Sequence, residues 1–279
     1  MDADGAAVSF ASVPPNVLMA CMDALVAADW RAASAARCTC RDFRAAVEQA
    51  FSRLRILRLV EAMLPNLELQ APFVRSMLPL CVNLRTVEIS GIFWDCANEL
   101  APALAHCRNL TCLSMRCCKI WDDGLEELVE RFGGMPNLEV LCVASADELT
   151  GCGWLDKLPA LTDLDISWCR LMNSIQLLGV SGQLRRLIAH GCDVLPMAIY
   201  GELHDVEELD VALTDFSDLG LHDLAQNSKC LRRLVLSDRD NANIWSPERW
   251  TRAGMEEFRL LRPDVQVDMF SLDGSWRTL

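Results

Sequence analysis

The segment from Leu161 to Ser167 reads LTDLDIS, and six variants of this phrase recur along the chain. The variants are LRTVEIS from Leu84, LTCLSMR from Leu110, LEVLCVA from Leu138, LRRLIAH from Leu184, VEELDVA from Val206 and LRRLVLS from Leu231. Each copy places apolar residues at positions 1, 4 and 6, a spacing that predicts a short strand with one buried side. Successive copies begin 26, 28, 23, 23, 22 and 25 residues apart. The sequence therefore predicts a solenoid of stacked repeats.

The period of these phrases lies within the roughly 20 to 29 residues of a leucine-rich repeat. One strand-turn-helix unit cannot bury its own apolar side, so neighbouring units stack and their strands form a continuous parallel sheet. The predicted fold class is an α/β leucine-rich-repeat solenoid with strands on the concave face and helices on the convex face. The segments between the strands supply further leucines that should face inward: Leu100, Leu104, Leu125, Leu128, Leu155, Leu158, Leu177, Leu221 and Leu224.

Composition limits the classes of partner. The formal charge of −13 repels a nucleic-acid backbone, which excludes nucleic acid as an expected partner. The sequence contains no run of about 20 apolar residues, so it predicts no membrane-spanning helix. The fourteen cysteines are expected to be reduced, because the first residues carry Asp2 and Asp4 where a secretory signal would be basic. We therefore expect a cytoplasmic or nuclear protein.

Composition also changes along the chain. We expect a mobile leader over residues 1–12, a helical domain over 13–52, the repeats over 53–270 and a tail over 271–279. The helical domain should contain three short helices, of which the third begins near Thr39 and buries Phe43, Val47 and Phe51. After Ser237 the residues DRDNANIWSPERWTRAG predict a polar loop, and VQVDMF from Val265 predicts a last strand.

The helical domain resembles an F-box. Val13-Pro14 and Val17-Leu18 match the opening proline and aliphatic pair of that family, and Met22 and Leu25 match the aliphatic positions that follow. Basic, cysteine and aromatic residues match its end: Arg37, Cys38, Arg41, Phe43 and Arg44. The repeats resemble the cysteine-containing leucine-rich repeats that often follow an F-box. Asn16 departs from the pattern, which usually has an acidic residue there.

This resemblance implies a function. F-box proteins bind a Skp-type adaptor, which links them to a cullin RING ubiquitin ligase, while their repeats capture the client protein that is ubiquitinated. The adaptor contacts that the resemblance implies are Pro14, Val17, Leu18, Met22, Leu25, Cys38 and Phe43. The alternative is a ligase-independent scaffold or assembly factor, in which the helices only cover the open end of the solenoid.

Positions 3, 5 and 7 of each phrase should point to the concave face. Two acidic strands, with Asp163 and Asp165 and with Glu208 and Asp210, flank a basic one with Arg186 and His190. We hypothesise that a basic segment of a client docks on the acidic strands; the alternative is a solvated strand face. The full predicted client-binding set is Glu88, Arg116, Asp163, Asp165, Arg186, His190, Glu208, Asp210 and Arg233.

Catalytic and metal motifs are weak. Cys38, Cys40, Cys117 and Cys118 lack a second pair at zinc spacing, and the histidines form no paired motif. We therefore predict a non-catalytic protein that needs no metal or cofactor. Five tryptophans near strand ends are either interface anchors or buried in the loop layer: Trp121, Trp154, Trp168, Trp245 and Trp250.

Overall fold

A computed structural model describes residues 41–60, 78–91, 100, 103–104, 106–130, 135–151, 153–171, 183–192, 200, 202–237, 250–270 and 276–278. Its strands form one ten-stranded sheet in sequence order. The strands are β1 (Ile56–Val60), β2 (Thr86–Ser90), β3 (Cys112–Arg116), β4 (Val140–Cys142), β5 (Asp163–Asp165), β6 (Arg186–Ile188), β7 (Glu208–Asp210), β8 (Arg233–Ser237), β9 (Gln266–Phe270) and β10 (Trp276–Thr278). Strands β1 to β9 are parallel, and β10 pairs antiparallel with β9.

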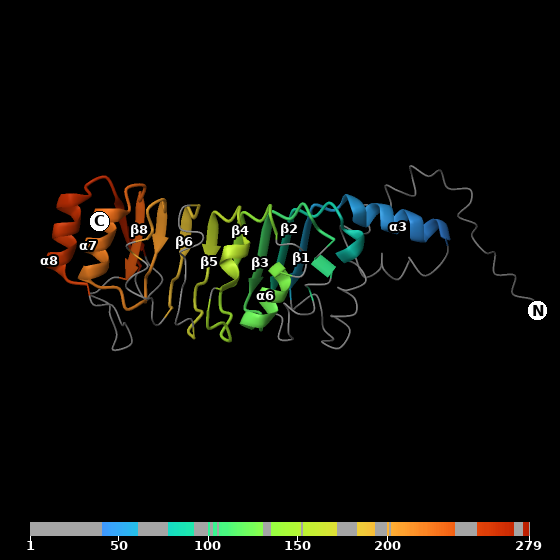
Figure 1. Cartoon of the computed structure of the whole chain (residues 1–279), viewed down its shortest axis with the longest axis horizontal. Coiled ribbons are helices and arrows are strands. Elements are labelled where there is room, and N and C mark those ends of the chain that lie inside the picture. The colour runs from blue at the N-terminus through green and yellow to red at the C-terminus, as the bar shows by residue number, and fades with distance from the viewer. Residues whose placement is uncertain are drawn as a thin grey trace, which may run out of the picture.

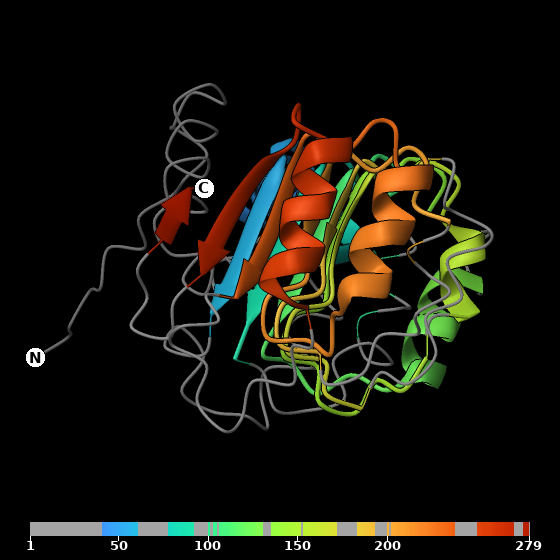
Figure 2. The same cartoon turned by 90° about the vertical axis from the view of Figure 1, so that its left-hand side faces the viewer.

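The helical elements lie behind the sheet or at its ends. Those in the described residues are α3 (Arg41–Arg53), η3 (Leu78–Leu80), α6 (Asp122–Glu130), η4 (Gly153–Lys157), α7 (Asp218–Asn227) and α8 (Arg252–Leu261). Figure 1 shows the strands side by side along the long axis, and Figure 2 shows α6, α7 and α8 on one face of the sheet. None of the described helices covers the opposite face, which we call the open face. This is the α/β leucine-rich-repeat solenoid that the sequence predicts.

The repeated apolar positions form the core. Positions 1, 4 and 6 of all seven phrases are at most 3% exposed. The segments that connect one strand to the next are called return segments here. Their predicted inward leucines are also buried, except that Leu177 lies outside the described residues. One turn geometry precedes the strands of five of the seven phrases, where the amide of position 1 donates to the carbonyl three residues earlier, as from Leu84 to Cys81 and from Leu110 to Cys107. The period of the apolar residues therefore sets both the core and the strand register.

The residue at position 8 turns the chain out of each strand in the left-handed backbone conformation. The φ values are 69° at Gly91, 53° at Cys117, 60° at Ser145, 62° at Trp168, 69° at Gly191 and 58° at Leu213. The amides of the first five donate to a carbonyl of the next repeat, as from Trp168 to His190 at 2.7 Å. These bonds continue the inter-repeat pairing beyond the ends of the strands.

Cysteines at position 9 add a second inter-repeat contact. The Cys169 Sγ lies 3.3 Å from the Val143 carbonyl, and the Cys192 Sγ lies 3.2 Å from the Ile166 carbonyl. The Cys118 thiol makes a longer contact with the Ile89 carbonyl. The nine cysteines that the structure describes form no disulfide with one another.

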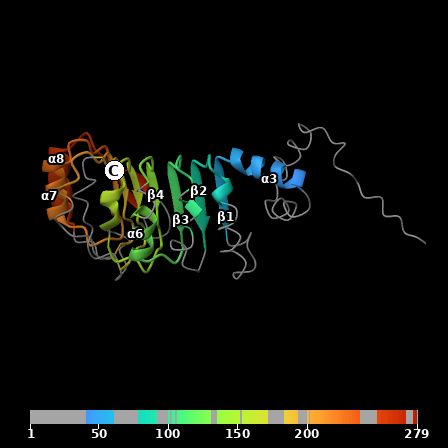
Figure 3. The ribbon, with the colours of Figure 1, turned by 45° about the vertical axis from the view of Figure 1, so that its right-hand side comes forward.

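Helix α3 packs on the first repeat. Val47 and Phe51 are 0% and 1% exposed and belong to the same core as Leu84. The Leu54 amide donates to the Phe51 carbonyl, and the Asn83 side chain donates to the Ser52 carbonyl at 2.7 Å. Helix α3 therefore closes the core at the β1 end of the sheet, where Figure 3 shows it. The described part of the helix begins at Arg41, and the predicted start near Thr39 lies outside the described residues.

The C-terminal end differs from the predicted loop. Helix α8 begins at Arg252, inside the stretch that the sequence analysis assigns to a polar loop ending at Gly254. Thr251 caps this helix by accepting a hydrogen bond from the Gly254 amide at 3.1 Å. Asp218 at the start of α7 in turn accepts hydrogen bonds from the Thr251 amide and hydroxyl. The predicted last strand is present as β9.

Candidate functional site on the open face

Side chains at positions 3, 5 and 7 line the open face. Strands β2 and β3 alternate between buried and more exposed residues, so Glu88 and Arg116 lie in their outward rows as expected. The faces of β4, β5 and β8 are less accessible: Cys142, Asp165, Ser167 and Val235 are at most 9% exposed. The open face is therefore partly covered by its own side chains near the centre.

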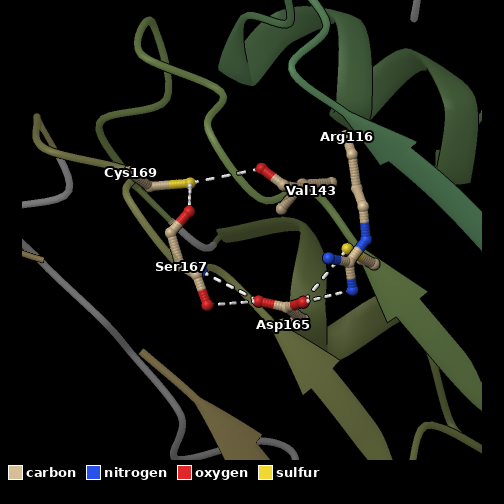
Figure 4. Close-up of polar contacts among 6 residues, drawn as sticks. Arg116, Val143, Asp165, Ser167 and Cys169 are labelled. Carbon is tan, nitrogen blue, oxygen red and sulfur yellow. Dashed lines mark hydrogen bonds and ion pairs between the residues drawn. The ribbon is translucent and has the colours of Figure 1, made fainter. Parts of the chain in front are cut away.

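Asp165 lies in a network on three strands. Its Oδ1 accepts hydrogen bonds from the amide and hydroxyl of Ser167 at 3.1 and 2.6 Å. Its Oδ2 accepts from Arg116 Nη2 at 2.9 Å, across β4, and from the Cys142 thiol at 3.3 Å. Figure 4 shows Arg116 and Ser167 on opposite sides of this carboxylate. Asp165 is 9% exposed and bonded to all of these partners. Its main role is therefore structural, because it holds β3, β4 and β5 together.

The Cys142 thiol is held in its neutral form. Burial is the largest cause that raises the pKa of Cys142, to about 11, and the nearby Asp165 carboxylate adds to the rise. A hydrogen bond from the Ala144 amide opposes it. A neutral thiol can donate to Asp165, whereas a thiolate beside a carboxylate would repel it. The arrangement favours a structural thiol over a nucleophile.

Strands β6 to β9 carry a chain of opposite charges. Arg186 Nε lies 3.2 Å from Glu208 Oε2, and Arg233 Nη1 lies 3.9 Å from the same oxygen. Arg233 Nε also contacts Asp268 Oδ2 at 2.7 Å. The predicted acidic strand β7 therefore pairs with arginines on both sides. A basic client segment would compete with these pairs for Glu208.

Asp268 on β9 belongs to this site, although the predicted set omits it. Burial of its carboxylate opposes ionisation, but hydrogen bonds from Gln266, Thr278 and Arg233 outweigh that cost and lower the pKa of Asp268. The alternation of VQVDMF places an acid on the outward side and could have identified it. The last repeated phrase ends at Ser237, so a prediction based on these phrases does not include Asp268.

Aromatic rings surround His190. Its Nδ1 lies 3.5 Å from Asp210 Oδ1, and its ring centroid lies 4.8 Å from Phe270 and 5.4 Å from Trp168. His190 and Asp210 are therefore paired with each other on the open face, where strands β6 and β7 end. Trp168 is 38% exposed, whereas Trp154 and Trp250 are buried. Trp121 is half-buried, and Trp245 lies outside the described residues.

Asp163 is the least engaged of the four predicted acids. Its Oδ2 accepts a hydrogen bond from the Thr162 hydroxyl at 2.7 Å, and no described cation pairs with it. The neighbouring strands form a shallow groove of about 270 Å³, with Ile188 and Val235 between the charged side chains of Arg186, Glu208 and Arg233. Asp163 and this groove form the part of the open face best suited to contact another protein.

The remaining predicted site residues lie elsewhere. Glu88 is paired with Arg58 of β1 at 2.7 Å. Six of the implied adaptor contacts lie outside the described residues: Pro14, Val17, Leu18, Met22, Leu25 and Cys38. Phe43 is in the first turn of α3, but its side chain is likewise outside the described part. Within that part, no three His, Cys, Asp or Glu side chains group as metal ligands.

Comparisons with known proteins agree with the architecture. Residues 106–129 match the family model described as "Leucine Rich repeat". The fold is similar to that of a leucine-rich-repeat protein from Leptospira interrogans, with a TM-score of 0.53 and 14% identity over 81% of this chain. The match spans 57% of that protein. The sequence matches no curated protein significantly. Among the described helices, none is long and apolar enough to cross a membrane.

Proposed function

We propose that this chain is a substrate receptor of a Skp-cullin-F-box ubiquitin ligase, with an N-terminal F-box that binds the adaptor and repeats that bind the client. The observation that supports client binding is the open face, where charged and apolar side chains line one groove. The described helices leave this face uncovered (Figure 2). The adaptor-binding half of the proposal is supported by the sequence resemblance of residues 13–52. The receptor has no catalytic role, because the transfer chemistry belongs to its partners.

The first experiment tests adaptor binding. Replacing Val17 and Leu18 with aspartate should abolish co-purification of the full chain with a Skp-type adaptor. Deleting residues 1–53 would be a poor test, because it also removes Val47 and Phe51 from the core. An unchanged circular dichroism melt would establish that the variant is folded. Failure of the parent chain to co-purify with the adaptor would refute the receptor assignment, and equal binding by the variant would refute Val17 and Leu18 as adaptor contacts.

The second experiment tests the client surface. Asp163→Lys should reduce capture of the proteins that accumulate when the chain is removed, as identified by mass spectrometry. Asp163 suits this test better than Asp165, whose reversal would break the network with Arg116 and Ser167. Glu257→Lys is the matched control, since Glu257 is exposed on α8 in the helical layer. Undiminished capture by the Asp163 variant would remove this part of the proposal.

The alternative is a ligase-independent scaffold. The packing of α3 favours it, because Val47 and Phe51 close the core of the first repeat as a cap would. Under this alternative the Val17 and Leu18 variants retain full cellular activity although they bind no adaptor. Complementation of a strain that lacks the chain separates the two functions.

A further inference from the structure

A second row of side chains follows the edge where the chain enters each strand. It occupies position 2 of successive repeats, and the amide of each member donates to the carbonyl of the one before, at 2.7 to 2.9 Å. The row, here called the edge row, runs Arg55, Arg85, Thr111, Glu139, Thr162, Arg185, Glu207 and Arg232. Equivalent side chains on neighbouring repeats are therefore about 4.8 Å apart.

The two halves of the edge row differ in charge balance. In the C-terminal half each arginine has an acidic partner: Arg185 lies 3.6 Å from Asp205, and Arg232 lies 3.6 Å from Glu207. In the N-terminal half Arg55 and Arg85 are adjacent and both exposed. Within the described residues, no carboxylate forms an ion pair with either of them. Two like charges on adjacent parallel strands repel each other, so this end of the row favours an added anion.

These arginines line a groove. The groove has a volume of about 720 Å³, and it is lined by Arg53, Arg55 and Arg85 at one end and by Glu139 at the other. Asn83 and Asn137 lie along it, and their amide groups are fixed by hydrogen bonds to the Ser52 and Arg108 carbonyls at 2.7 and 3.0 Å. The lining is thus polar, basic at one end and acidic at the other.

We propose that this groove binds an extended acidic segment of a partner protein, with carboxylates on Arg55 and Arg85 and a basic side chain near Glu139. Guanidinium groups form paired hydrogen bonds with carboxylates, which suits adjacent arginines. Successive side chains of an extended segment point to opposite sides, so the contacts with this row come from alternate residues. Arg55 and Glu139 are three repeats, roughly 14 Å, apart, which an extended chain covers in about four residues. The segment therefore has two acidic residues two positions apart, followed two positions later by lysine or arginine. The proposal does not depend on adaptor binding.

The test uses a fluorescein-labelled peptide, GEGEGKG, and fluorescence anisotropy with the full chain. We expect saturable binding that weakens as salt rises, and about tenfold or greater loss for GQGQGKG. The Arg55→Glu, Arg85→Glu double variant should lose GEGEGKG binding to a similar extent and should bind GKGKGKG instead, because Glu139 is unchanged. Arg259→Gln is the matched control, because Arg259 is exposed on α8 and has no described partner.

Folding is checked separately. If Arg55 and Arg85 repel each other, Arg85→Gln should melt at or above the temperature of the parent chain, and added salt should stabilise the parent more than the variant. Absence of GEGEGKG binding, or equal binding by the double variant, would overturn the proposal. Binding of a phosphoserine peptide without binding of GEGEGKG would assign the groove to phosphate and overturn the carboxylate assignment.

Discussion

At the scale of single residues, the turn after each strand is the most demanding position. Position 8 is left-handed in all six described repeats from Gly91 to Leu213, although four of the six residues are not glycine. A side chain in this conformation costs roughly 1–2 kcal/mol. Gly191 has a second constraint, because an added Cβ would lie 2.6 Å from the Trp168 ring. The ring can therefore cover the next turn only if residue 191 lacks a side chain.

Gly191→Ala should lower the free energy of unfolding by about 1–3 kcal/mol, since the new methyl group meets both the left-handed backbone and the ring. Urea denaturation measures this change. Gly153→Ala is the control, because its Cβ would make only an ordinary contact, 3.6 Å from Glu126. If the two variants were equally stable, the ring contact would have no energetic role.

Buried thiols give the protein a pH dependence. Burial raises the pKa of Cys81 and Cys169 to about 12 and that of Cys107 to about 11. Unfolded thiols ionise near 9.0, so above that pH the unfolded chain releases protons that the folded chain retains. The folded state should therefore lose stability as pH rises from 9, by about 1 kcal/mol per thiol at pH 10.

Thermal melts between pH 7 and 10 test this prediction. Cys169→Ala should flatten the decline relative to the parent chain, whereas Cys117→Ala should leave it unchanged because Cys117 is exposed. The Cys169 variant should also be less stable at pH 7, because the Val143 carbonyl loses its 3.3 Å contact. An identical decline for both variants would assign the pH dependence to other groups.

At the scale of elements, the sequence predicts strands well and the C-terminal helix poorly. Positions 1, 4 and 6 repeat without exception, so β2 to β8 follow from the apolar pattern alone. Helix α8 begins in a polar stretch, because its start depends on a carboxylate 33 residues earlier, Asp218. The ion pairs of Asp165 and Glu208 were also unpredictable, since they depend on which neighbouring strand supplies the arginine.

Asp218→Ala should destabilise α8 selectively. The substitution removes the acceptor for the Thr251 amide and hydroxyl, which costs roughly 1–3 kcal/mol for a partly buried group. Hydrogen exchange should therefore accelerate over Arg252–Leu261 more than over β3. Asp223→Ala on the same helix serves as the control. Uniform acceleration along the whole chain would indicate global rather than local destabilisation.

At the scale of the whole molecule, the two ends of the sheet are covered differently. Helix α3 packs on the core of the first repeat, and β10 occupies the edge of β9. β10 is antiparallel, so the run of parallel strands stops there, and the Thr278 hydroxyl donates to Asp268 at 2.7 Å. An uncovered strand edge is a template for pairing with another molecule.

Removing residues 271–279 should expose the β9 edge and cause self-association. Light scattering coupled to size-exclusion chromatography would then give a mass above that of the 31.1 kDa chain. Thr278→Ala keeps the backbone pairing of β10 and should stay at the parent's mass, with lower stability. A truncated chain of unchanged mass would indicate that β10 is dispensable as an edge cover.

The return segments differ in kind, whereas the strands do not. Between β3 and β4 the return contains the nine-residue helix α6, while between β4 and β5 it contains the five-residue turn η4. The strand register is continuous across both. Since the thickness of each repeat on the helical side determines how the solenoid bends, curvature is encoded in segments that do not touch the open face. Exchanging one return for another could therefore reshape the molecule while its surface chemistry stays the same.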